Sequence, residues 1–176
     1  MLVSHLELNG VLLFEPDVFK DARGSFSEVF KSSYTPEEIK FVQDNESVSK
    51  YGVLRGIHFQ KKPFEQSKLV RVSKGEMQDV VVDLRKGSPT FGRYMSFFLS
   101  KENGKQIFIP KGFGHGFLSL SEELIVNYKV DNKYSKKSES GIIYNDKDLS
   151  IKWALETKDL IISDKDLQLP LLRDLV

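Results

Sequence analysis

The sequence contains no cysteine, which excludes a disulfide framework, a thiolate nucleophile and a metal cluster held by cysteines. An excess of charge of one sign is missing too, because 26 Lys and Arg residues oppose 25 Asp and Glu residues and leave a net charge of +1. The net charge therefore produces no overall electrostatic attraction to nucleic acid or to an anionic membrane, so any anion site must depend on a few local basic residues.

Long apolar runs are also absent. No stretch approaches the ~20 apolar residues of a membrane-spanning helix. Residues 1–7 also lack the basic segment that precedes an apolar segment in a signal peptide. Glycine-rich loops of the dinucleotide or P-loop type are missing, so a nicotinamide or ATP would lack its usual cradle. We expect a soluble, cytoplasmic protein with no cofactor and no membrane or nucleic-acid partner.

The 176 residues fit one domain, 1–176, because a chain of roughly 150 residues already buries about 70% of its unfolded surface. Short apolar runs recur between turn signals such as Lys74-Gly75 and Asn103-Gly104. Many short strands at this spacing are typical of a β-sandwich or barrel. The runs cover residues 11–14, 25–30, 53–60, 69–73, 77–84, 94–99, 106–109, 116–120 and 124–130.

Helical signals are confined to the edges of this pattern. Thr35 is suited to cap a helix, Pro36 to occupy its first position and Glu38 to close a capping box. We therefore expect a short peripheral helix there. From residue 135 onwards polar runs alternate with apolar ones, which predicts a tail that wraps the sheet with one or two helical turns.

Two of the three histidines lie in similar surroundings. His58 follows Arg55 in a strand-like apolar run, and His115 is flanked by Gly114 and Gly116, which would leave room for a ligand to approach the ring. Histidine can move protons near neutral pH, and arginine can hold an anion. Because residues two apart share a face of a strand, strand parity places His58 and Arg55 on opposite faces.

Two further side chains could complete a site for proton transfer. Parity in the run 124–130 directs Tyr128 to the apolar face, where a phenol usually has a partner. Lys68 opens a strand, and a lysine at the edge of an apolar enclosure can stabilise a developing oxyanion. Taken singly, such a histidine or tyrosine is more often a packed core residue, and such a lysine or arginine a surface charge. The interpretation depends on the whole set.

A metal site is disfavoured, because the histidines at 5, 58 and 115 are dispersed and no cysteine is available as a further ligand.

The chain resembles one family over residues 12 to 170, the dTDP-4-dehydrorhamnose 3,5-epimerases. The resemblance implies an all-β fold, a cupin-type jelly-roll sandwich or barrel with a few short peripheral helices. It rests on ordered blocks at residues 21–28, 41–47, 54–60, 68–72, 82–85, 88–92, 109–117, 144–146 and 163–166.

By position, the resemblance implies that His58 is the general base and that Asp166 orients its ring. Tyr128 would be the general acid on the opposite side of the sugar, and Lys68 would stabilise an enolate at the C4 oxygen. No metal and no cofactor are implied. The residues implied to contact the nucleotide, the diphosphate or the sugar ring are Arg23, Phe26, Glu28, Gln43, Asp44, Asn45, Arg55, His115, Glu139 and Lys165.

The implied reaction converts dTDP-4-dehydro-6-deoxy-D-glucose to dTDP-4-dehydro-L-rhamnose by inversion at C3 and C5. A carbon next to a ketone is a weak acid, so the enzyme must supply a base and spread the resulting charge onto the ketone oxygen. Inversion then requires a proton from the other face. Arg23 and Arg55 suit the diphosphate, because a guanidinium binds phosphate oxygens in pairs.

The resemblance also implies a homodimer in which an N-terminal segment with Arg23, Phe26 and Glu28 is exchanged between protomers, while the C-terminal tail wraps the barrel. The partner molecule would be a nucleotide-sugar substrate. Three alternatives stay open: a mono-epimerase acting at C3 or C5 only, a ketoisomerase on a related nucleotide-linked 4-keto sugar, and a carbohydrate- or nucleotide-binding cupin without activity.

Overall fold

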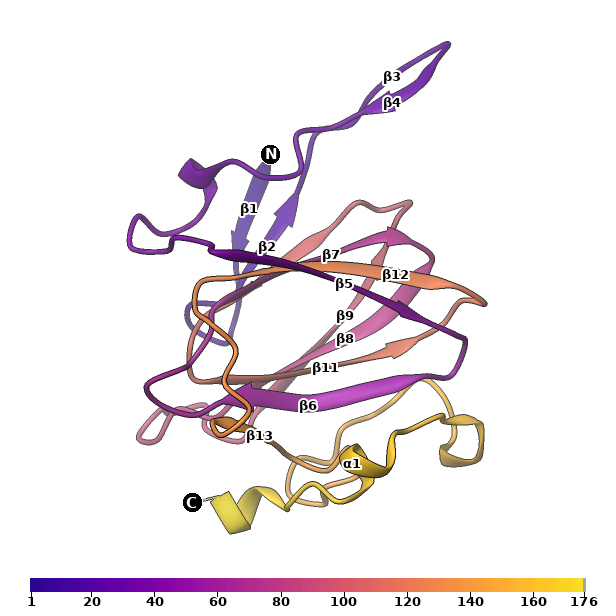
Figure 1. The fold of residues 1–176 in the computed structure, drawn as a ribbon. Coiled ribbons are helices and arrows are strands. Elements are labelled where there is room, and N and C mark those ends of the chain that lie inside the picture. Colours follow the sequence, from indigo (N-terminus) through magenta and orange to yellow (C-terminus); the bar gives the residue numbers. More distant parts are fainter. Residues whose placement is uncertain (176) are drawn as a thin grey trace.

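The computed structural model describes residues 1–175, and most of its strands form two sheets that face each other (Figure 1). In spatial order, the first sheet contains β1 (Leu2–His5), β2 (Leu12–Glu15), β10 (Gln106–Ile109), β7 (Lys68–Lys74), β12 (Leu124–Val130) and β5 (Gln43–Ser49). The second contains β13 (Glu139–Gly141), β6 (Leu54–Gln60), β11 (Phe113–Ser119), β8 (Glu76–Asp83) and β9 (Tyr94–Ser100). Neighbouring strands within both sheets are antiparallel. The predicted all-β cupin-type fold is confirmed.

The main hydrophobic core lies between the two sheets. Val70 and Val126 of the first sheet and Val81 of the second are 0% exposed and belong to this core. In β12 the inward side chains alternate, as the period of a strand requires. Tyr128 continues that alternation and packs against the core, as the sequence predicts.

The C-terminal segment covers the outer face of the second sheet (yellow in Figure 1). Ile57 and Val82 of the sheet pack there with Ile142 and Leu172. The segment has little regular structure: the helix α1 (Asp164–Leu167) and the 3-10 helices η2 (Thr157–Asp159) and η3 (Leu172–Leu175). Packing on the sheet brings α1 close to β6 (Figure 1).

A hairpin of β3 (Phe19–Asp21) and β4 (Gly24–Phe26) projects away from the two sheets (top of Figure 1). The chain then returns and covers the outer face of the first sheet, where Phe30 and Phe41 pack with Phe14 and Phe108. The exposed hairpin is therefore attached to a well-packed base.

The helix predicted to begin at Thr35 does not form. A 3-10 helix, η1 (Ser32–Tyr34), ends just before it instead. The Thr35 hydroxyl donates back to the carbonyl of Ser32 at 3.2 Å, so it is engaged with the preceding turn and does not cap a following helix. Ile39 meanwhile packs into the apolar cluster on the first sheet. Tertiary packing thus overrides the local capping signal.

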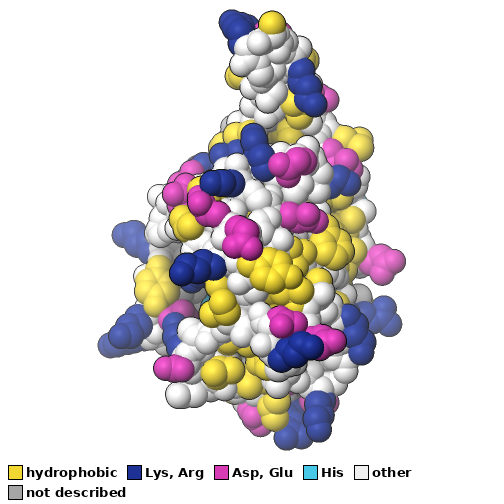
Figure 2. All heavy atoms as spheres, turned by 90° about the vertical axis from the view of Figure 1, so that its right-hand side faces the viewer, with side chains coloured by type: hydrophobic (Ala, Val, Ile, Leu, Met, Phe, Trp, Pro, Cys, Tyr) yellow, Lys and Arg dark blue, Asp and Glu magenta, His cyan; other side chains and the backbone are white. Residues whose placement is uncertain are grey.

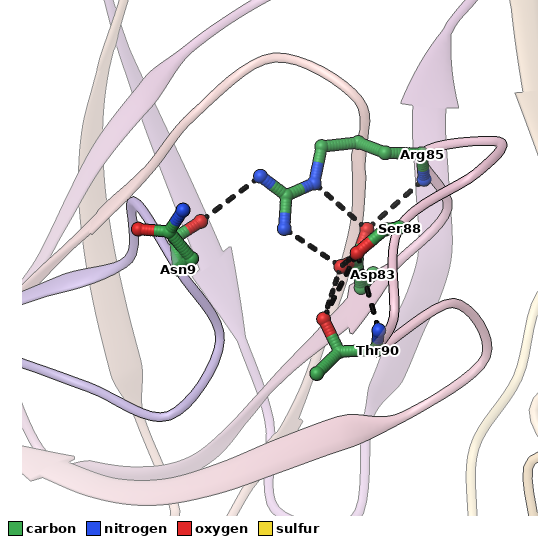
Figure 3. A network of polar contacts seen from close by, with 5 residues as sticks. All are labelled: Asn9, Asp83, Arg85, Ser88 and Thr90. Atoms are coloured by element: carbon green, nitrogen blue, oxygen red, sulfur yellow. Dashed lines mark hydrogen bonds and ion pairs between the residues drawn. The ribbon is translucent and has the colours of Figure 1, made fainter.

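A buried carboxylate ties β8 to the loop that follows it (Figure 3). Asp83 is 0% exposed and accepts hydrogen bonds from Arg85 at 2.7 and 2.9 Å and from the hydroxyls of Ser88 and Thr90 at 2.6 Å. Arg85 also donates to the carbonyl of Asn9 at 3.0 Å. Burial raises the pKa of Asp83, but these hydrogen bonds outweigh it and hold the pKa well below its usual value.

The surface seen in Figure 2 carries basic and acidic side chains interspersed with apolar ones, and the β3–β4 hairpin stands at its top. No large area of one sign covers this face, which agrees with the net charge of +1. Within residues 1–175, none of the helices has the length and apolar character needed to span a membrane.

Candidate active site

A cavity of 540 Å³ lies among β5, β7 and β12 of the first sheet, β6 and β11 of the second, and residues 161–166 of the C-terminal segment. The four residues predicted to be catalytic, at 58, 68, 128 and 166, all line it. The full lining is Ser47, Val53, Leu54, Arg55, His58, Lys68, His115, Gly116, Phe117, Tyr128, Ile161, Ile162, Ser163, Lys165 and Asp166.

The two sheets contribute different chemistry to this cavity. His58 and His115 come from the second sheet, where they lie opposite each other on the neighbouring strands β6 and β11. Lys68 and Tyr128 come from the neighbouring strands β7 and β12 of the first sheet. A molecule bound between the sheets therefore has imidazole on one side and a phenol and an ammonium group on the other.

His58 forms a close pair with Asp166, 108 residues further along the chain. His58 Nε2 lies 2.7 Å from Asp166 Oδ1, and the Gly56 backbone N–H donates to Asp166 Oδ2 at 3.3 Å. The Ser163 hydroxyl accepts from the Asp166 backbone N–H and so fixes the start of α1. Burial raises the pKa of Asp166, but the bond from His58 and the other contacts lower it overall. In the neutral ring a proton on Nε2 is directed to the carboxylate, which leaves Nδ1 unprotonated and able to accept a proton.

Lys68 lies on the inward face of β7, in line with the buried Val70 and Val72. Burial lowers the pKa of Lys68 to about 8, although the negative charge of Asp79 opposes this shift. Lys68 is therefore still mostly cationic at neutral pH. In such an enclosed site a positive charge stabilises an oxyanion far more strongly than it does in water.

Burial raises the pKa of the Tyr128 phenol, and the positive charge of Arg55 opposes the shift. The phenol therefore keeps its proton at neutral pH and is available as a donor. Because Tyr128 also packs against the core, its ring is held in place on the wall formed by the first sheet.

The prediction that Arg55 and His58 face opposite ways is wrong, since both line the cavity. In the pairing of β6 with β11, His58 lies opposite His115 and Arg55 lies opposite Phe117. These pairs are three residues apart on β6 but only two residues apart on β11. This bulge inserts one extra residue and reverses the alternation of side chains beyond it. Arg55 is then held toward β5 by a hydrogen bond from its Nε to the Ser49 hydroxyl at 3.1 Å.

The glycines around His115 serve strand packing more than ligand access. A Cβ atom on Gly114 would lie 2.6 Å from Ile57 Cγ2, and one on Gly116 would lie 2.9 Å from the carbonyl oxygen of Arg55. Any side chain at these positions would push β6 away from β11. The glycines thus allow the close approach that sets His58 beside His115.

His115 forms a second pair of the same kind, with a residue that the sequence reasoning missed. Its Nε2 lies 2.7 Å from Oδ2 of Asp79, and the two residues are 8% and 0% exposed. The signal in the sequence was an acidic residue within the apolar run of β8. Each of these histidines has one carboxylate partner, and nowhere in residues 1–175 are three or more His, Cys, Asp or Glu side chains grouped to hold a metal ion.

A polar cluster lies next to His58 on the pairing of β13 with β6. Lys165, which lines the cavity, contacts Glu139 with its Nζ 2.6 Å from Oε1. Tyr134, a second residue that the sequence reasoning missed, donates its hydroxyl to Glu139 Oε2 at 2.8 Å. Burial raises the pKa of Glu139, but the bonds from Lys165 and Tyr134 lower it overall. The cluster therefore presents an ionised carboxylate and an ammonium group beside the cavity.

The predicted contacts on β5 fall on two faces. Gln43 and Asn45 share the face of Ser47, which lines the cavity, and the Gln43 amide donates to Asn45 Oδ1 at 2.7 Å. Asp44 is on the other face, where it pairs with Lys129 at 2.6 Å. The structure thus brings Gln43 and Asn45 to the side of the cavity and leaves Asp44 outside it.

The predicted contacts near the N-terminus do not line this cavity. Arg23 lies on the projecting hairpin and pairs with Asp21 at 2.7 Å, while Phe26 is 69% exposed. Glu28 accepts a hydrogen bond from the Tyr34 hydroxyl at 2.6 Å. Within one chain the structure therefore does not bring these three predicted contacts together with His58.

Comparison with known proteins points to one family. Residues 5–174 match the family described as dTDP-4-dehydrorhamnose 3,5-epimerase. A protein of that name from Methanothermobacter thermautotrophicus is 53% identical over 164 residues, which is 90% of this chain and 88% of its own. The crystal structure of a dTDP-6-deoxy-D-glucose-3,5-epimerase from Legionella pneumophila in complex with dTDP-4-keto-L-rhamnose is 41% identical, with a TM-score of 0.93 over 98% of this chain and 93% of its own. A 3'-monoepimerase from Streptomyces bikiniensis in complex with dTDP-quinovose is 32% identical, with a TM-score of 0.89 over 96% of this chain and 87% of its own.

Proposed function

Because this chain belongs to the dTDP-4-dehydrorhamnose 3,5-epimerase family, we propose how its own residues carry the reaction of that family. The enzyme is an isomerase of dTDP-rhamnose biosynthesis that inverts C3 and C5 of dTDP-4-dehydro-6-deoxy-D-glucose to give dTDP-4-dehydro-L-rhamnose. One observation carries the proposal: His58, paired with Asp166 of α1, lines the same cavity as Tyr128 but from the other sheet.

In the first half of each inversion, Nδ1 of His58 removes the proton from a carbon next to the C4 ketone. The C–H electron pair forms a double bond to C4, and the π pair of the C4 carbonyl moves onto its oxygen to give an enolate. Asp166 stabilises the imidazolium that forms, because its carboxylate accepts a hydrogen bond from Nε2–H, with Nε2 2.7 Å from Oδ1. Lys68 stabilises the negative oxygen, for which its half-buried ammonium group is suited.

In the second half, Tyr128 donates its phenolic proton to the opposite face of the same carbon, and the ketone is restored. Return of the original proton by His58 would only regenerate the substrate, so the acid must come from the other wall. His58 then releases its proton to solvent, and Tyr128 takes one up. The same cycle at the second carbon on the other side of the ketone completes the double inversion.

We propose that the charged groups at the rim of the cavity hold the nucleotide diphosphate. Arg55 lines the cavity, with its Nε donating to the Ser49 hydroxyl and its Nη2 to the Val48 carbonyl, and its remaining N–H groups suit phosphate oxygens. Lys165 and Glu139 offer a cation and an acceptor nearby, and His115 offers a ring nitrogen. Gln43 and Asn45 offer amides along β5.

We further propose a homodimer in which the β3–β4 hairpin of each protomer reaches the cavity of its neighbour. The hairpin projects into open space (Figure 1), and its Arg23 and Phe26 find no place at the cavity of their own chain. Glu28 follows the same segment. A second copy of the chain would cover the exposed ring of Phe26.

We also propose that the enzyme is cytoplasmic, because a sequence without cysteine fits a reducing compartment.

The decisive experiment incubates the protein with dTDP-4-dehydro-6-deoxy-D-glucose in deuterated water. Deuterium at both C3 and C5, with formation of the L-rhamno product, is expected. Label at one carbon only would identify a mono-epimerase, and a displaced carbonyl would identify a ketoisomerase. Tight binding without any exchange would show that the protein is a binding cupin and would refute the proposed chemistry.

A further inference from the structure

Two buried side-chain atoms within residues 1–175 have no hydrogen-bond partner, Ser47 Oγ and Asp79 Oδ1. Ser47 lines the cavity, and Asp79 lies behind His115, which also lines it. Buried polar atoms are nearly always paired, and an unpaired oxygen on a buried carboxylate costs more than one on a neutral hydroxyl. The unpaired oxygen of Asp79 therefore destabilises the fold, and Asp79 contacts a residue that lines the cavity.

Asp79 occupies the inward face of β8, between Met77 and Val81, both of which are 0% exposed. On such a face an apolar side chain would pack better than a carboxylate. Within residues 1–175 the side chain of Asp79 has one hydrogen-bond partner, Nε2 of His115, and His58 uses the same ring nitrogen toward Asp166. Two imidazole–carboxylate pairs therefore lie side by side on β6 and β11.

The charge of Asp79 also acts on Lys68, the ammonium group that lines the cavity from the other sheet. Burial alone would favour the neutral amine, and Asp79 opposes this effect. One carboxylate thus influences two groups of the cavity, a ring from the second sheet and a cation from the first.

We propose that Asp79 is a positioning residue of the epimerase, which orients His115 toward the substrate and retains the positive charge of Lys68 beside the C4 oxygen. This inference rests on the proposed function. With the Nε2 proton directed to Asp79, His115 leaves Nδ1 for a substrate hydroxyl. With a carboxylate in place, Lys68 enters the reaction as a cation that can hold the enolate.

The substitution Asp79→Asn removes the negative charge but keeps the size of the side chain, and the amide oxygen can still accept a hydrogen bond from His115. The matched control is Asp83→Asn, which removes another fully buried carboxylate of β8 that does not line the cavity. Both variants are assayed for turnover between pH 6 and about 9, at a temperature where circular dichroism shows them folded. Asp79→Asn is expected to lower kcat by about tenfold or more, with a smaller change in KM.

The pH profile is the readout that a purely structural role would not move. In Asp79→Asn the alkaline limb is expected to shift to lower pH, since Lys68 loses its charge earlier. Asp83→Asn is expected to melt at a lower temperature yet keep the wild-type profile. A wild-type kcat and profile in Asp79→Asn would overturn the inference, whereas a wild-type protein that gives no deuterium exchange would overturn the proposed function instead.

If Asp79→Asn does not fold, NMR of the wild-type protein can still test whether Asp79 orients His115. Nitrogen NMR of histidine-labelled protein reports which ring nitrogen of His115 carries the proton, once the resonance is identified with His115→Gln. A proton on Nε2 of the neutral ring is expected, because Asp79 accepts there. A neutral ring protonated on Nδ1 would show that Asp79 does not orient His115 and would refute the inference.

Discussion

His58 and Tyr128 line one cavity from different sheets, His58 from β6 of the second sheet and Tyr128 from β12 of the first. A base and an acid on opposing walls reach opposite faces of whatever lies between them. This arrangement makes inversion the natural outcome of a proton transfer, whereas a base and an acid on one wall would favour return of the proton to the same face.

Replacing the base should stop the reaction without preventing binding. In His58→Asn we expect kcat to fall by about 10²–10⁴-fold, the usual contribution of a general base. Calorimetry with dTDP should give a Kd close to that of the wild type, since Arg55, Lys165 and the fold remain. His5→Asn, on β1 and away from the cavity, is the matched control and should turn over normally. Retained turnover in His58→Asn would place the base elsewhere.

Replacing the acid should separate exchange from inversion. In Tyr128→Phe the base can still remove a proton and return deuterium from the same side, so labelled substrate of unchanged configuration should accumulate in deuterated water. Formation of the inverted product should fall by about 10²-fold or more. NMR of the sugar distinguishes the two. Tyr51→Phe, whose ring is 44% exposed, serves as control. Inversion at the wild-type rate in Tyr128→Phe would remove the phenol from the mechanism.

Turnover should decline as the solution becomes alkaline. Burial lowers the pKa of Lys68 to about 8, so the ammonium group is charged below that pH and neutral above it. Because only the cation stabilises the enolate, kcat should fall as the pH rises through about 8. A pH profile of kcat at saturating substrate measures this. Lys68→Gln should have low activity at every pH, and a profile that stays flat to pH 9 or so would contradict the role of Lys68.

The Asp83 network should make the fold sensitive to acid. The pKa of Asp83 is held well below 3.8, the usual value of an Asp carboxyl, so its stabilisation is complete above about pH 4 and is lost as the pH falls further. Asp83→Asn should lower the free energy of unfolding at pH 7 by about 2–4 kcal/mol. Urea unfolding at pH 7 and at pH 3 tests both points, since the difference between the two proteins should shrink in acid. An unchanged difference would mean that the charge of Asp83 contributes little.

If the two protomers of a homodimer share their active sites, two inactive variants should restore activity when they form a mixed dimer. If each cavity takes Arg23 from the neighbour, a mixed dimer of Arg23→Ala and His58→Asn holds one intact site. Dissociating and reassociating equal amounts should then restore about a quarter of the wild-type activity, since half of the dimers are mixed. Mixing His58→Asn with Tyr128→Phe is the control and should restore nothing, because both residues belong to the same chain's cavity. No gain from the first mixture would argue against exchange.

Much of the fold could be predicted from the sequence, because the central strands are continuous apolar runs between turns. The strand β5 could not, since its sequence is polar: it lies at the sheet edge, with Asp44 and Glu46 on the face away from the cavity. The capping signal at Thr35 misled because its hydroxyl bonds backwards to Ser32. Local patterns fail where an element's environment is set by tertiary packing.

The site was harder to derive than the fold. Family resemblance supplied Asp166, which no local spacing could connect to a histidine 108 residues earlier. Strand parity placed Tyr128 correctly and Arg55 wrongly, because one extra residue in β6 reverses the alternation. Asp79 was visible as an acid in an apolar strand, yet only the structure shows that it bonds to His115.

The position of Asp166 has a consequence for how activity arises during synthesis. His58 lies on a central strand, but its partner lies in α1, which follows the last strand of both sheets. The proposed catalytic pair of His58 and Asp166 therefore forms only once the C-terminal segment has docked on the second sheet. A nascent or clipped chain that ends before α1 would lack the carboxylate that orients His58, and it would also lack Leu172, which packs on the outer face of the second sheet.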